Sequence, residues 1–235
     1  MGLRFAQQST LSSINKTVHT NVNLPAAIAA LAFLSTGFIL TVATIVLMQS
    51  LFVRKMGRAR IVLVVMLILG LLYFGALIIF SLVSRDQLLA HGQEKHFCEL
   101  DCHLAYSIAN VTRAKTFGAG ASETRAEGQF IIITIKTRFD ETTIGPRRGN
   151  GLLFPNGRAF TLVDDRGNRY GLTAQAGTPV TTPLRPGESY PTDLGFDLPP
   201  DVKPAVLLLN ESAWETHFLI GHENSPAHGQ TKFQI

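Results

Sequence analysis

The sequence has few charged residues, and charge is absent from two long stretches. Asp, Glu, Lys and Arg make up 16% of the 235 residues, whereas hydrophobic residues make up 46%. No charged side chain occurs from Thr17 to Val53 or from Ile61 to Ser84. A helix needs about 20 apolar residues to cross the hydrocarbon layer of a membrane. The missing charge therefore predicts two membrane-spanning helices, at about residues 24–48 and 61–83.

The sequence also lacks the usual marks of an enzyme. It contains no glycine-rich phosphate loop, no catalytic triad and no pair of carboxylates that stands out. No ionisable residue lies in the middle of either apolar run, which is where proton and ion pathways place such residues. We therefore expect a protein that is not an enzyme, with no catalytic residues and no small-molecule substrate.

The linker between the apolar runs is strongly basic. Four of the seven residues at 54–60 are Arg or Lys, and short loops of this kind stay in the cytoplasm. The runs then form a hairpin in the plasma (inner) membrane, with both termini and the C-terminal domain extracytoplasmic. A cleaved signal peptide is the alternative for the first run, but the apolar stretch is full length. The net charge of +4 owes much to this linker and does not indicate a nucleic-acid partner.

Small residues occur inside both runs. Gly37 lies in the first, and Gly70 and Gly75 lie in the second. Small side chains let membrane helices approach each other closely. We therefore expect the two helices to pack on each other at these positions.

After the second run, short apolar segments alternate with turn residues. Residues 129–139 are rich in β-branched side chains, and 159–163 alternate before a turn containing Gly167, as in a β-hairpin. Similar signals recur roughly every ten residues, with a further strand expected at 214–220, and predict an all-β immunoglobulin-like sandwich preceded by an α-helical transmembrane hairpin. The expected division is a polar leader, the hairpin, a Cys/His connector and the sandwich, at residues 1–23, 24–85, 86–103 and 104–235.

One part of this outer domain resembles a known family. The segments FTLVDD (160–165), GN (167–168), Tyr170, LRPGE (184–188) and FDLP (196–199) resemble the telokin-like, immunoglobulin-type domains of unknown function on bacterial lipoproteins and membrane proteins. The resemblance covers about half of the outer domain and depends mainly on turn residues. It implies an adhesion, assembly or binding module without an active site, with the membrane and other membrane-protein subunits as partners.

The stretch HFCELDCHL, residues 96–104, contains both cysteines of the chain. Disulfides form in extracytoplasmic compartments, so a bridge between Cys98 and Cys102 is one interpretation. A second is a metal site, because thiolates together with the imidazoles of His96 and His103 suit copper or zinc. A third is attachment of haem c, although its motif, Cys-x2-Cys-His, is one residue shorter.

The gross plan also resembles subunit II of haem–copper oxidases. In that family two spans with both ends outside precede a β domain, in which a Cys-x3-Cys loop holds copper. Only Cys98 and Cys102 match, because Tyr106 stands where the family has histidine and no methionine follows. The resemblance implies an alternative function, a copper- or haem-binding electron-transfer subunit.

Two further groups of residues are candidates for partner binding. Long loops are often functional, and Arg147 and Arg148 in loop 141–157 offer positive charge to an anionic partner. His222 and Glu223 lie between two expected strands, either as partner-binding or ion-binding groups or in a capped surface turn. The main expectation is a membrane-anchored extracytoplasmic binding or assembly module, accessory to a larger membrane complex.

Overall fold

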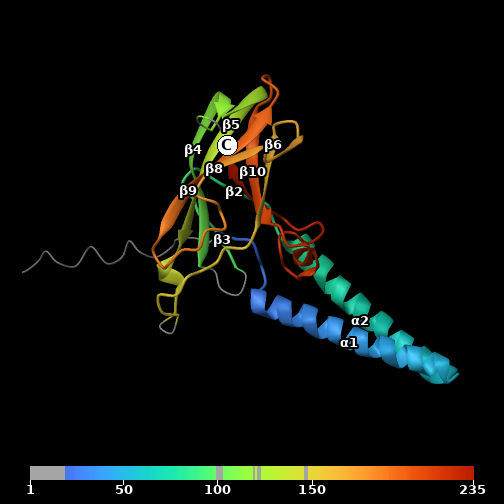
Figure 1. Cartoon of the computed structure of the whole chain (residues 1–235). Helices are drawn as coiled ribbons and strands as arrows, with labels where there is room; N and C mark the ends of the chain where they lie inside the picture. The colour runs from blue at the N-terminus through green and yellow to red at the C-terminus, as the bar shows by residue number, and fades with distance from the viewer. Residues whose placement is uncertain (1–18, 99–102, 119, 121–122, 146–147) are drawn as a thin grey trace, which may run out of the picture.

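Two long apolar helices precede a mostly β domain in the computed structural model (Figure 1). The structure describes residues 19–98, 103–118, 120, 123–145 and 148–235. Its helices are α1 (Ala26–Phe52) and α2 (Met56–Val83), with two short 3-10 helices, η2 (Glu141–Thr143) and η3 (Trp214–Phe218). Its strands are β1 (His19–Thr20), β2 (Gln87–Leu89), β3 (Lys95–Phe97), β4 (Leu104–Phe117), β5 (Thr124–Phe139), β6 (Arg158–Asp164), β7 (Arg169–Gly171), β8 (Ala174–Gly177), β9 (Ser189–Leu198), β10 (Pro204–Glu211) and β11 (Thr231–Gln234).

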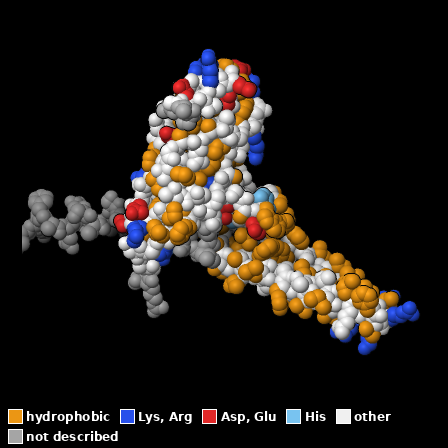
Figure 2. All heavy atoms as spheres, in the orientation of Figure 1, with side chains coloured by type: hydrophobic (Ala, Val, Ile, Leu, Met, Phe, Trp, Pro, Cys, Tyr) orange, Lys and Arg blue, Asp and Glu red, His pale blue; other side chains and the backbone are white. Residues whose placement is uncertain are grey.

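The two helices extend away from the β domain with their apolar side chains uncovered. They contain 27 and 28 residues, or about 40 Å at 1.5 Å per residue, which is longer than the hydrocarbon layer. Phe38 and Leu71 are more than 70% exposed, unlike side chains on the core helices of a soluble protein. Figure 2 shows hydrophobic side chains along the hairpin and basic ones at its far tip. Both apolar helices are therefore present, and their exposed faces suggest membrane association.

The two helices pack on each other as expected, but the glycines do not lie at the contact. A Cβ added at Gly37, Gly70 or Gly75 would meet no heavy atom of the described residues within 4 Å. The groove between the helices is instead lined by larger side chains, among them Phe38 and Val65. The glycines therefore do not mark a point of close contact between the helices.

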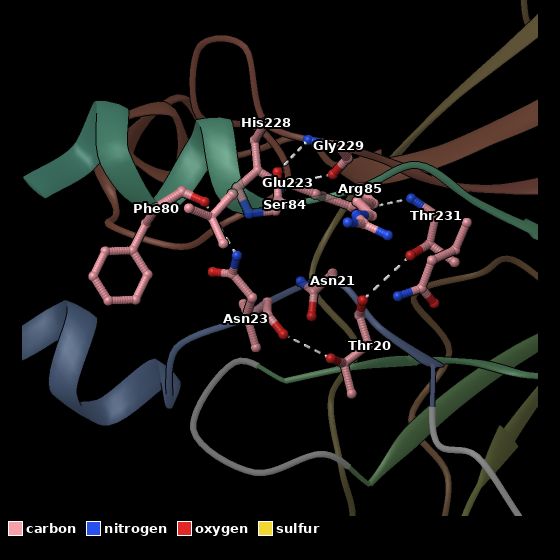
Figure 3. Close-up of a pocket in the computed structure, with 13 residues that line it drawn as sticks. Thr20, Asn21, Asn23, Phe80, Ser84, Arg85, Glu223, His228, Gly229 and Thr231 are labelled. Carbon is pink, nitrogen blue, oxygen red and sulfur yellow. Dashed lines mark hydrogen bonds between the residues drawn. The ribbon is translucent and has the colours of Figure 1, made fainter.

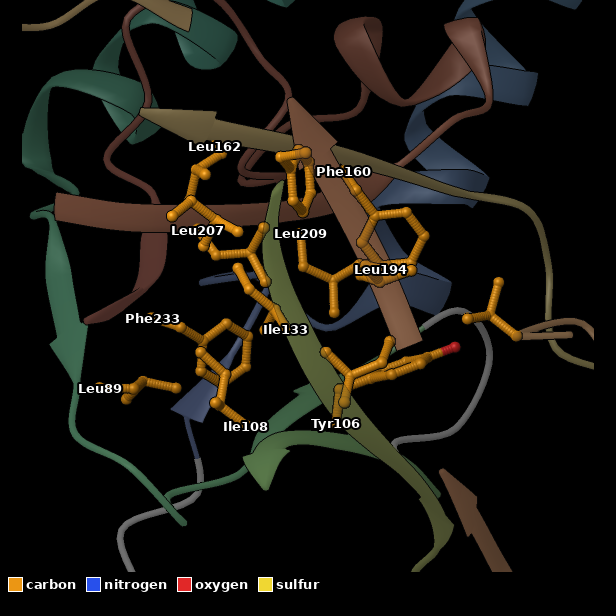
Figure 4. Packing of buried hydrophobic residues seen from close by; sticks show 14 of the residues in the cluster. Leu89, Tyr106, Ile108, Ile133, Phe160, Leu162, Leu194, Leu207, Leu209 and Phe233 are labelled. Carbon is orange, nitrogen blue, oxygen red and sulfur yellow. The ribbon is translucent and has the colours of Figure 1, made fainter. Parts of the chain in front are cut away.

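The β domain is a sandwich of two mixed sheets. One sheet has the order β1-β3-β4-β5-β9-β8 and the other has the order β2-β11-β10-β6-β7. The pairs β1–β3 and β2–β11 are parallel, whereas the other pairs in each sheet are antiparallel. Figure 4 shows the core between them, where Ile108 and Ile133 of the first sheet face Leu162, Leu207 and Phe233 of the second. The alternation of apolar side chains predicted a β-sandwich, and the two sheets confirm it, while the immunoglobulin-like type stays a prediction.

The strand expected at residues 214–220 is instead the 3-10 helix η3 followed by a turn. Its alternating apolar residues resemble a strand, but side-chain hydrogen bonds fold the segment back. Thr216 donates its hydroxyl to the carbonyl of Ala213, and Asn224 donates its amide to the Thr216 hydroxyl at 2.7 Å. Local bonds of this kind compete with sheet pairing.

The two outer ends of the hairpin are both incorporated into the sheets. Before α1, β1 pairs with β3, and Val22 forms a bridge with His222. After α2, β2 pairs with β11. The end of the leader and the Cys/His connector therefore supply strands to the β domain, and both outer helix ends lie at the same side of it.

Candidate functional site

A pocket lies where the hairpin meets the β domain (Figure 3). Its volume is about 390 Å³. We call this region the junction and define it by the segments 20–24, 80–87 and 221–231. Residues that line the pocket come from all three segments and include Thr20, Asn21, Asn23, Phe80, Ser84, Arg85, Glu223, His228 and Thr231. Three parts of the chain that are far apart in sequence therefore form one site beside the apolar helices.

Two glycines allow the backbone segments of the junction to approach closely. The Gly229 N–H donates to the Ser84 hydroxyl at 2.6 Å, and a Cβ at Gly229 would lie 2.4 Å from the carbonyl carbon of Arg85. Gly221 has a φ of +76°, and its Cβ would lie 2.5 Å from Asn23 Oδ1. A side chain at either position has no room, so these glycines hold the β domain against the helix ends.

A buried ion pair lies behind the pocket. The Lys95 ammonium donates to Glu223 Oε2 at 2.8 Å, to the Leu209 carbonyl at 2.6 Å and to the Thr231 carbonyl at 3.0 Å. Burial lowers the pKa of Lys95 and raises that of Glu223, while the attraction between the two charges acts in the opposite direction. Four chain segments thus meet at one ammonium group, as expected of a buried charge that must be fully hydrogen-bonded.

Asn21 connects the leader to the same network. Its amide nitrogen donates to Glu211 Oε1 at 2.7 Å, and its Oδ1 accepts from the Cys98 N–H at 2.9 Å. Glu211 also lies 3.5 Å from His222 Nε2. Burial would raise the pKa of Glu211, but its contacts with His222 and other groups bring that pKa below its ordinary value. Neither Lys95 nor Asn21 carries a sequence signal that would have identified it.

The expectation that His222 and Glu223 lie on a surface turn is wrong. Their exposed fractions are 3% and 2%. His222 contacts Asn21 and Glu211, and Glu223 holds Lys95. Both side chains are buried between the chain segments that they connect. They belong to the hydrogen-bond network of the junction and are not accessible to a partner.

Three potential metal ligands meet beside the first sheet, and an arginine contacts both of their carboxylates. Ligand atoms of Glu94, His96 and Asp140 lie within 4.8 Å of one another. Arg138 donates to Glu94 Oε1 at 2.7 Å and contacts Asp140 Oδ2 at 3.0 Å. His96 Nε2 also lies 3.0 Å from Asp140 Oδ2. The guanidinium thus occupies oxygens of both carboxylates and supplies one of the two positive charges that would balance them.

The two histidines predicted as copper or haem ligands each contact another side chain, and the copper or haem site itself stays a prediction. His96 is bonded to Asp140, whereas His103 lies 2.5 Å from the Thr143 hydroxyl and stacks on Phe139. Cys98 is buried, and no cysteine among the described residues is free. Cys102 lies outside the described residues, so its pairing with Cys98 stays a prediction.

The arginine pair of the long loop is only partly described. Arg147 lies outside the described residues. Arg148 turns back onto its own loop, where its guanidinium donates to the carbonyls of Gly151 and Leu152 at 3.3 and 3.4 Å. It also lies 5.4 Å from the centre of the Phe139 ring. Its role in partner binding stays a prediction.

Acidification is expected to remove the stability that Asp140 contributes. Burial alone would raise the pKa of this carboxyl group, but hydrogen bonds from Arg138, His96 and Thr142 bring it well below its ordinary value. The folded state therefore favours the ionised form relative to the unfolded chain, whose Asp pKa is about 3.9. The gain is complete above that pH and is lost as the pH falls through the folded pKa.

Thermal unfolding of the wild type and of Asp140→Asn, from about pH 7 to about pH 3, tests this linkage. We expect the variant to be less stable near neutral pH and the difference to shrink on acidification. A difference that stays constant over this range would contradict the assignment.

No family model and no curated protein matches the chain. Among solved structures, MPT63, a secreted protein of Mycobacterium tuberculosis, is similar over 65% of this chain and 99% of its own, with 14% sequence identity and a TM-score of 0.41. At these values the similarity supports no statement about shared function.

Proposed function

We propose that the chain is a membrane-anchored, extracytoplasmic immunoglobulin-like module for binding or assembly, accessory to other membrane proteins. The observation that carries this proposal is the double attachment of the hairpin to the sandwich. Each outer helix end is joined to a sheet strand by five residues or fewer. Hydrogen bonds of Asn21 and Gly229 tie these connections to the β domain. Attachment at two points fixes the orientation of the sandwich relative to the membrane. A fixed orientation suits a subunit that binds its partner in a single arrangement.

Two further features support a binding role over a catalytic one. The acidic and basic groups of the junction include a fully buried pair, Lys95 with Glu223, whose charges are engaged with each other. Exposed apolar side chains occur instead on the long loop, where Leu152 is 44% and Phe154 67% exposed. Exposed apolar residues on a loop held by a rigid scaffold are a common form of protein contact.

The proposed topology places the basic turn in the cytoplasm and the sandwich outside. Substituted cysteines test it in intact cells that produce the full chain. We expect Gly57→Cys, in the basic turn, to react with a membrane-impermeant maleimide only after permeabilisation, because the bilayer shields it. Asp165→Cys, in the exposed turn between β6 and β7, should react without permeabilisation.

The unsubstituted chain is the control for the native cysteines. The opposite labelling pattern would place the sandwich in the cytoplasm and overturn the proposed function together with the predicted disulfide. Equal labelling of both positions in intact cells would show that the hairpin does not cross the membrane.

A further inference from the structure

We propose that η3 (Trp214–Phe218) is a second membrane contact, seated among the lipids of the outer leaflet beside α2. This inference rests on the proposed insertion of the hairpin and adds a lipid-binding surface on the sandwich itself. The ligand class is a phospholipid bilayer, met at the boundary between headgroups and acyl chains. Three observations support this position.

The first observation is a contact far down α2. The Tyr73 hydroxyl donates to the Phe218 carbonyl at 2.7 Å. Tyr73 precedes Val83, the last residue of α2, by ten residues, or about 15 Å along the axis. Helical side chains also tilt towards the helix N-terminus, which for α2 is the proposed cytoplasmic end. The backbone of η3 therefore lies well below the outer end of the helix.

The second observation is the exposed apolar surface above this contact. Leu82 and Val83, in the last turn of α2, are 69% and 75% exposed. With 28 residues, α2 is longer than the hydrocarbon layer, so its outermost turns reach the headgroup region. Headgroups and the upper acyl chains therefore cover these side chains at the end of α2. A segment that touches Tyr73 then lies at a depth where lipid is present.

The third observation is the amphipathic character of η3 itself. Trp214 and Phe218 pack edge to face at 5.9 Å, yet they remain 66% and 39% exposed. Glu215 and His217 are exposed on the same short helix, and a carboxylate cannot enter hydrocarbon without a large cost. Trp is enriched where apolar chains meet headgroups. The composition therefore favours the interface over the membrane centre.

Figure 1 and Figure 2 agree with this placement. In Figure 1 the loops that follow β10 lie against the upper end of α2. In Figure 2 hydrophobic side chains continue from that end along the whole hairpin. The exposed aromatic pair of η3 thus adjoins the surface that is proposed to face lipid.

Trp214 is the only tryptophan of the chain, so its fluorescence reports on η3 alone. The full chain is reconstituted into phosphatidylcholine vesicles, with bromine atoms placed at shallow or deep positions on the acyl chains. We expect shallow bromines to quench the emission about twofold or more, deep bromines to quench it less, and aqueous iodide to have little effect, because the indole sits at the interface.

The matched control is Trp214→Phe combined with Phe154→Trp. Phe154 is 67% exposed on the long loop before β6, which contributes no residue to the pocket at the junction. Its emission should respond to iodide and not to bromine. Strong iodide quenching of Trp214 without bromine quenching, as in the control, would overturn the inference.

Flotation of the vesicles separates this inference from the proposed function. Protein that floats with the vesicles after alkaline washing has an inserted hairpin, so an aqueous Trp214 in that sample overturns only the η3 contact. Protein that stays at the bottom of the gradient overturns both.

Discussion

Replacing Lys95 with methionine is expected to lower the free energy of unfolding by about 3–5 kcal/mol. The Lys95 side chain is fully buried, and its ammonium lies 2.8 Å from Glu223. Methionine fills a similar volume but leaves the Glu223 carboxylate without its counter-charge. The carbonyls of Leu209 and Thr231 also lose their donor. The loss in the free energy of unfolding comes from buried polar groups that are left without a hydrogen-bond partner. It is therefore larger than the net contribution of the ion pair to stability.

The double variant distinguishes this explanation from a simple loss of packing. Lys95→Met combined with Glu223→Leu removes both charges, so we expect it to lose less stability than the sum of the two single variants. Chemical unfolding of the full chain in detergent micelles, followed by circular dichroism, measures all three. If the loss of stability in the double variant equals the sum of the losses in the single variants, the explanation by an unpaired buried charge is contradicted.

Lys232→Met is the matched control, because Lys232 pairs with Asp86 in a partly exposed position. Exposed ion pairs contribute less than about 1 kcal/mol. A loss at Lys232 as large as that at Lys95 would show that the position in the β domain, and not burial of the charge, determines the effect.

Substituting Gly229 with alanine is expected to lower the free energy of unfolding by about 1–3 kcal/mol. It is also expected to weaken the attachment of the sandwich to the hairpin. The new Cβ would lie 2.4 Å from the carbonyl carbon and 2.7 Å from the oxygen of Arg85. Backbone atoms cannot rotate away as a flexible side chain can. The segment before β11 must therefore move away from the end of α2, and the Gly229–Ser84 hydrogen bond weakens.

Limited proteolysis and thermal unfolding of the full chain measure this effect. We expect faster cleavage near Arg85 and a lower unfolding temperature than in the wild type. Gly57→Ala is the control, since no heavy atom of the described residues lies within 4 Å of its Cβ. Equal cleavage rates for Gly229→Ala and Gly57→Ala would show that the close approach does not hold the junction together.

The features that the sequence predicted are those in which neighbouring residues carry the information. The lack of charge in two runs was enough to predict α1 and α2. The turn after β6 was also predicted from neighbouring residues. Asp164 accepts hydrogen bonds from the N–H groups of Arg166 and Asn168, and Gly167 adopts a φ of +85°. Each of these contacts spans four residues or fewer.

The candidate site was predicted only in part, for the opposite reason. His96, Cys98, His222 and Glu223 were selected by residue type, and the structure brings their segments together at the junction. His222 and Glu223 are buried and not on a surface turn, because residue type does not reveal burial. A histidine or a carboxylate appears as a ligand in the sequence, whether it lies on the surface or inside an ion-pair network.

The sequence by itself determined that two apolar helices precede a β-rich domain, since hydrophobicity and turn chemistry act over short distances. Only the tertiary structure decided how the β domain is attached to the two helices. Lys95 meets Glu223 across 128 positions, and Asn21 meets Glu211 across 190. Such pairs form because folding encloses charges that must find a partner away from water, and no local pattern specifies which partner that is.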